Sequence, residues 1–123
     1  MDTLTFINAD LQRTLSVFDD LVRTWPGGPW TWDGRFSVPV SIVREPELEH
    51  ALSVVRTIMP YEFDSQAREH LPDSLASAIA ARGGLRSGQL AFCDHINNGS
   101  VRFCLWWPWN SGDAVSIRVG IAD

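Results

Sequence analysis

The stretch FCLWWPWN, residues Phe103–Asn110, holds three of the six tryptophans of the chain. Aromatic and branched apolar side chains favour the pleated surface of a β-sheet, so the stretch predicts a strand. Alternate residues of a strand point to opposite faces of its sheet. Which of these side chains enter the core therefore depends on how this strand pairs with the strands before and after it.

Two turn signals flank the predicted strand. NNGS at residues 97–100 is typical of a tight β-hairpin, and NSGD at residues 110–113 indicates a second turn. These turns divide the last third of the chain into strands at residues 89–96, 101–109 and 114–122. The sequence thus predicts a three-stranded meander at the C-terminal end.

The first hairpin bears on the two cysteines of the chain. A two-residue loop at positions 98–99 would place Cys93 directly opposite Cys104. That placement is a hydrogen-bonded pair, in which side chains lie less close than at the alternate sites. Without a secretion signal, two free thiols are favoured over a disulfide.

The second hairpin is assigned by the apolar pattern. A two-residue loop would place Trp107 opposite Ser116, whereas a three-residue loop places Trp107 opposite Ile117. A one-residue slip turns every side chain to the other face, so we expect the three-residue loop, which gathers the apolar residues on one face. The inner face then contains Phe103, Leu105, Trp107, Trp109, Ile117 and Val119, and the other face contains Cys104, Trp106 and Arg118.

The rest of the chain supplies the helices and further strands. Leu11, Leu15, Phe18, Val22 and Trp25 recur at helical spacing and predict an amphipathic helix that ends before PGGP. The other predicted elements are a short edge strand at 3–7, a half-buried strand at 35–43 that Pro39 confines to an edge or a bulge, a helix at 46–59, an irregular piece at 61–70 and a short helix at 72–82. We expect a single α+β domain over residues 1–123, with a mainly antiparallel sheet of four or five strands and two or three helices packed on one face.

Charge and hydropathy exclude several classes of protein. The net charge is −5 and all ten basic residues are arginines, which form no basic run, so nucleic-acid binding is disfavoured. An acidic surface suits a basic protein partner better. The chain shows no signal peptide and no run of about 18 apolar residues that a membrane helix needs, so we expect a cytoplasmic protein without membrane contact.

Catalytic and cofactor-binding motifs are missing from the sequence. It contains no GxSxG, phosphate-binding loop, GxGxxG or HExxH pattern, so we expect neither an enzyme nor a cofactor. Glu47 and His50 share helical spacing, but two candidate ligands do not make a metal site. Cys93 and His95 can share a strand face as a nucleophile pair, although a packed thiol is favoured.

The remaining signal is the use of tryptophan and arginine, which are enriched where proteins bind one another. Trp30 and Trp32 lie in a turn-rich loop, and we favour the view that they fold back over the core. The expected partner-binding residues are Trp30, Trp32, Arg102, Trp106 and Arg118, with Trp106 neighbouring Arg118, together with the acidic Glu45, Glu47 and Glu49.

These features favour a small acidic protein-binding module. By analogy of size and charge, we expect a bacterial immunity protein of the antitoxin type, which neutralises a basic toxin or effector encoded nearby. One alternative is a small-molecule-binding or enzymatic domain, for which Asp94 is the one good inward polar candidate. Another is an oligomeric structural subunit or a secretion chaperone, so both a monomer and a homodimer remain open.

Overall fold

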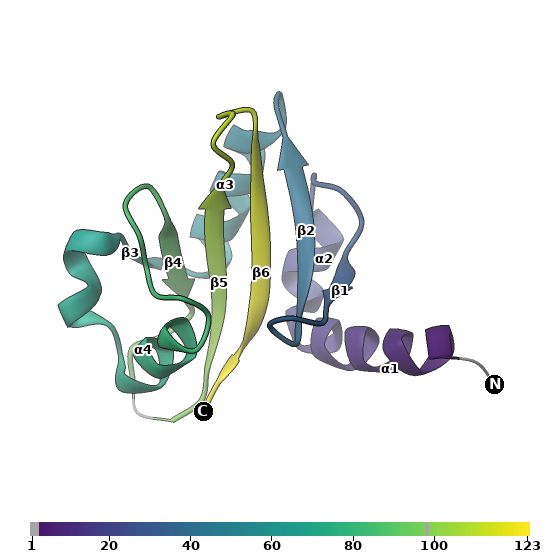
Figure 1. The fold of residues 1–123 in the computed structure, drawn as a ribbon, viewed down its shortest axis with the longest axis horizontal. Coiled ribbons are helices and arrows are strands. Elements are labelled where there is room, and N and C mark those ends of the chain that lie inside the picture. The colour runs from purple at the N-terminus through teal and green to yellow at the C-terminus, as the bar shows by residue number, and fades with distance from the viewer. Residues whose placement is uncertain (1–2, 98) are drawn as a thin grey trace.

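A computed structural model of the protein describes residues 3–97 and 99–123 and shows one six-stranded antiparallel sheet flanked by helices (Figure 1). Its elements are helix α1 (Thr3–Leu15), the 3₁₀ turn η1 (Ser16–Phe18), helix α2 (Asp19–Thr24), strands β1 (Thr31–Asp33) and β2 (Val38–Arg44), helix α3 (Leu48–Ile58), strand β3 (Tyr61–Phe63), the 3₁₀ segment η2 (Ser65–His70), helix α4 (Asp73–Ala80), and strands β4 (Leu90–Cys93), β5 (Val101–Pro108) and β6 (Ala114–Ala122). The predicted α+β class with an antiparallel sheet and a C-terminal meander is confirmed, with six strands in place of four or five.

The strand order is β1-β2-β6-β5-β4-β3, so β5 and β6 lie at the centre and the three-residue strands β1 and β3 form the edges. Of the two placements predicted for the strand containing Pro39, an edge or a bulge, the edge is wrong, because β1 pairs outside this strand. Pro39 faces Trp32 of β1, and the pairing of β2 with β6 begins one residue later, at Val40. The proline, which has no N–H to donate, thus lies beyond the segment that pairs with β6.

Helices cover both faces of the sheet, and the prediction that they pack on one face is wrong. On the back face, Phe18, Leu21 and Val55 from η1, α2 and α3 pack on the sheet, whereas Leu75 and Ile79 of α4 pack on the front face. Figure 1 shows α2 and α3 behind the strands and α4 in front of them. In the part of the chain that is described, no helix combines the length and the apolar character needed to cross a membrane.

Both predicted registers differ from the structure by one residue. Phe92 faces Cys104 in the β4–β5 pair, and Trp107 faces Ser116 in the β5–β6 pair. The second register is the one given by a two-residue loop, which was not expected because it mixes apolar and polar residues. That expectation suits a strand with one buried face, whereas β5 buries residues on both of its faces. As a result Trp106 points to the back and Trp107 to the front.

The predicted strand at residues 3–7 is also wrong, because these residues form the first part of α1. In the sequence, Leu4 and Ile7 extend the spacing of Leu11 and Leu15 toward the N-terminus, and this helical period outweighs a short alternation. The predicted helix at residues 11–25 is present but is interrupted at η1, where Phe18 has φ −116° and ψ 29°.

The two cysteines lie in different cores. Cys93 belongs to the front cluster and Cys104 to the back cluster, and both are buried and free. Burial raises the pKa of Cys93 to about 11 and also raises the pKa of Cys104. A thiol with a raised pKa carries little of the reactive thiolate at neutral pH.

We therefore expect neither Cys93 nor Cys104 to react with a thiol-specific reagent in the native protein, and both to react once urea unfolds the chain. The measurement is the number of labelled thiols against time, by absorbance and by mass spectrometry. Rapid native labelling, or an internal disulfide in the unreduced protein, would contradict the two-sided core.

Candidate protein-binding surface

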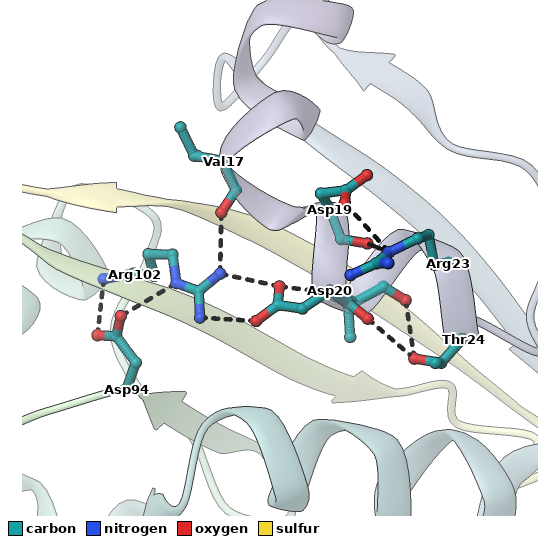
Figure 2. Close-up of polar contacts among 8 residues, drawn as sticks. Val17, Asp19, Asp20, Arg23, Thr24, Asp94 and Arg102 are labelled. Atoms are coloured by element: carbon teal, nitrogen blue, oxygen red, sulfur yellow. Dashed lines mark hydrogen bonds and ion pairs between the residues drawn. The ribbon is translucent and has the colours of Figure 1, made fainter.

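Arg102 of β5 is a structural link rather than a free surface group, as Figure 2 shows. Its Nε donates to Asp94 Oδ2 at 3.0 Å, and its terminal nitrogens donate to the two carboxylate oxygens of Asp20 at 2.9 and 3.1 Å. One of these nitrogens also donates to the carbonyl of Val17 at 2.8 Å. The guanidinium thus joins the end of β4, strand β5 and the break between η1 and α2.

The link uses the donors that Arg102 could offer to a partner. The guanidinium also lies 5.5 Å from the ring centre of Phe18, and the Arg102 side chain is only 23% exposed. The hydrogen bond from Arg102 holds the pKa of Asp20 below its ordinary value of 3.8. Asp94, the one inward polar residue expected to serve a small ligand, is likewise engaged by Arg102.

Trp106 is 6% exposed and lies in the back core. Trp25 and Trp30 pack against the same core, with their ring centres 5.2 Å apart. The Nε1 of Trp25 donates to the hydroxyl of Ser41, which in turn donates to the carbonyl of Gly28, so the loop is fastened to β2. The loop tryptophan Trp30 therefore folds back over the core, and Trp106 offers a partner almost no surface.

Arg118 does not neighbour Trp106, because the two residues point to opposite faces of the sheet. Arg118 points to the front, where its guanidinium lies 4.4 Å from the ring centre of Trp107 and 5.6 Å from that of Phe36. Its Nε donates to Asp33 Oδ2 at 2.8 Å. The predicted arginine–tryptophan contact thus exists with the next tryptophan along the strand.

The front face is only partly covered. Helix α4 packs near the start of β5 and the end of β6, where Val101 and Ala122 belong to its cluster. Figure 1 shows no helix in front of the other end of β2, β6 and β5. We name this region the open face; its exposed residues are Ile42, Arg44 and Trp109, and its half-buried residues are Val40, Trp107, Ser116 and Arg118, whose side chain is only 16% exposed.

The side chains of the open face lie in rows across the strands. Ile42 pairs with Ser116, which pairs with Trp107, and Arg44 pairs with Ala114 in the next row. Trp109 completes that row, because its N–H donates to the carbonyl of Ala114 at 2.9 Å. Ile42 is 39% exposed and Trp109 is 36% exposed, which makes them the large apolar residues that this face presents to solvent.

Hydrogen bonds and stacking hold the polar groups of the open face in place. The indole N–H of Trp109 donates to Ser116 Oγ at 2.9 Å, and the guanidinium of Arg44 lies 4.8 Å from the Trp109 ring centre. Burial alone would raise the pKa of Asp33, but hydrogen bonds from Arg118 and from the Phe36 N–H outweigh it and lower that pKa. Asp33 is therefore ionised and keeps Arg118 in position over Trp107.

The three glutamates predicted to bind a partner are exposed, and Glu45 directly follows Arg44 of the open face. Glu45 and Glu47 lie in the connection from β2 to α3, and Glu49 lies in the first turn of α3. The N–H of Glu45 donates to the carbonyl of Asp113 at 3.1 Å, which joins this connection to the β5–β6 turn. We name Glu45, Glu47, Glu49 and Asp113 the acidic rim.

The structure thus separates the predicted site residues. Arg118 lies within the open face and Glu45 borders it, Glu47 and Glu49 lie at the start of α3, Trp30, Arg102 and Trp106 serve the back core, and Trp32 is half-buried in β1. Ile42, Arg44, Trp107 and Trp109 of the open face were not among the predicted partner-binding residues. The signal that could have identified Trp107 was the β5–β6 register with a two-residue loop, in which Trp107 pairs with the polar Ser116.

Other chemistry is weakly supported. Within residues 3–97 and 99–123, no group of three or more His, Cys, Asp or Glu side chains is placed to hold a metal ion. A Cys93–His95 nucleophile pair would need a lowered thiol pKa, and burial raises that of Cys93.

We expect Arg102→Met to lower the free energy of unfolding by about 2 kcal/mol, because it leaves two carboxylates without their cation. Arg23→Met on α2, the helix that carries Asp20, is the control; the pair of Arg23 with Asp19 is 71% exposed on both sides and should contribute less than about 0.5 kcal/mol. Urea unfolding of the three proteins measures both effects.

The ion pair between Arg102 and Asp20 also predicts that the stability of the protein depends on pH. The pKa of Asp20 is lowered from 3.8, so its contribution is complete above that value and is lost as the pH falls through the lower folded pKa. The stability difference between wild type and Arg102→Met should therefore shrink below about pH 4. A difference that stays constant with pH, or that equals the Arg23→Met effect, would show that the link is not ionic.

Comparison of the chain with protein-family models, with curated proteins and with solved structures gave no match.

Proposed function

We propose that the protein is a protein-binding domain that acts through its open face, as an immunity protein that neutralises a toxin or effector encoded nearby in a bacterial genome. The observation that carries this proposal is that the exposed side chains of Ile42 and Trp109 lie on one face. On the same face Arg44 stacks on Trp109, and Arg118 stacks on Trp107. Tryptophan and arginine are the residues most enriched at the energetic centres of protein interfaces.

Fixed side chains favour tight binding, because less conformational entropy is lost when the partner docks. Trp109 is held by Ser116 and Arg44, and Trp107 is held by Phe36 and Arg118. The strands beneath them are paired on both sides, as β6 lies between β2 and β5. The open face thus has little to order on binding.

A neutralising role also needs no chemistry beyond occupation of the partner's surface. This agrees with a site made of apolar, aromatic and arginine side chains and with the net charge of −5, which favours encounter with a basic toxin or effector. A small-molecule site is less well supported, since Arg102 binds Asp94.

The first test is co-purification of the protein with the product of the adjacent gene, followed by neutralisation of that product's toxicity. We expect Trp109→Ala to weaken binding at least about tenfold and Ile42→Ala several-fold, as at the centre of an interface. Tyr61→Ala and Ile121→Ala are matched controls, because these residues are 41% and 45% exposed but lie off the open face.

Binding that survives Trp109→Ala and Ile42→Ala but is lost in a control variant would move the interface away from the open face. If the adjacent gene product is neither bound nor neutralised, the immunity role fails. Sedimentation at several concentrations measures whether the occupant of the open face is instead a second copy of the chain. A dimer that Trp109→Ala dissociates would assign the open face to self-association.

A further inference from the structure

On the basis of this proposed function, we infer the chemistry of the partner: it places arginine or lysine side chains on the acidic rim and an apolar side chain on Ile42 and Trp109. The rim meets the open face at Glu45 and Asp113 and extends through Glu47 to Glu49 at the start of α3. Arg44 and Glu45 are adjacent in the chain, and the backbone bond from Glu45 to Asp113 closes the end of the face beside Trp109.

The rim is the uncompensated charge at this site. By contrast, Asp33 near the open face binds Arg118, and Asp20 and Asp94 bind Arg102. The three glutamates of the rim are exposed and form no ion pair within the described part of the chain. The neighbouring Arg44 stacks on Trp109, and its single positive charge is outnumbered by the four carboxylates of the rim.

Stabilisation of helix α3 does not account for the whole rim. Glu47 and Glu49 lie at the N-terminal end of α3, where negative charge is favourable in any helix. Asp113, however, lies in the turn between β5 and β6, and Glu45 precedes the helix. These two carboxylates gain little from the helix and are brought to the others by the fold.

The resulting surface has the organisation of a protein interface, with an apolar centre and a polar edge. Its negative edge would attract a cationic partner at long range, raise the association rate and make binding weaken with salt. The apolar centre would instead govern dissociation. The two parts of the surface therefore predict separable effects on binding.

The test uses the full chain and a defined probe, an eight-residue peptide of alternating arginine and leucine, with a glutamate–leucine peptide as its counterpart. We compare Glu45→Gln/Glu47→Gln/Glu49→Gln with Glu69→Gln/Asp73→Asn/Asp123→Asn, which removes the same charge elsewhere on exposed positions. Nuclear magnetic resonance measures binding through the indole N–H signals, and circular dichroism checks that each variant is folded.

The arginine–leucine peptide should shift the Trp109 indole signal, and the rim variant should weaken its binding about tenfold at low salt, as expected for three exposed charge pairs. The matched variant should weaken it less than about twofold. Equal weakening in both variants, or equal binding of the glutamate–leucine peptide, would overturn the inference. Binding of the adjacent gene product through Trp109 with no effect of the rim variant would overturn the inference and leave the proposed function standing.

Discussion

The burial of strands β5 and β6 on both faces is the constraint on which the rest of the structure depends. Phe103 enters the front core and Cys104 the back core, so successive residues of β5 are both buried. A strand of this kind needs helices on each side, and α2 with α3 supplies one layer while α4 supplies the other. Gly120 faces Phe103 in the register, and a Cβ there would lie 2.7 Å from the Phe103 ring, so the pair fits only without a side chain.

This constraint explains what could be predicted from the sequence. The helical periods and the three strands of the meander were readable because they are local, whereas the tight turn predicted at residues 98–99 includes Asn98, which lies outside the described residues. The registers were not, since apolar residues on both faces of β5 remove the alternation that selects one register. The edge strands β1 and β3 have only three residues each and no pattern of their own. The link from Arg102 to Asp20 joins residues 82 positions apart, which no local pattern indicates.

The register also decides which tryptophans reach the surface. Trp106 is inside, covered by the back-face helices and the loop that carries Trp30, and it leaves the candidate site. Trp107 and Trp109 face the front, where α4 does not reach and arginines stack on both rings. The candidate site is thus the end of the sheet whose front face is not covered by α4 (Figure 1).

The pairing of β5 with β6 is the most direct test, because a shift of one residue would exchange the buried and presented tryptophans. Nuclear Overhauser contacts between backbone protons report this pairing in solution. The structure predicts contacts of Trp106 with Ile117 and of Trp107 with Ser116, and contacts of the Trp107 ring with Phe36. Contacts of the Trp107 backbone with Ile117 would place Trp106 on the front face and contradict the assignment of the open face.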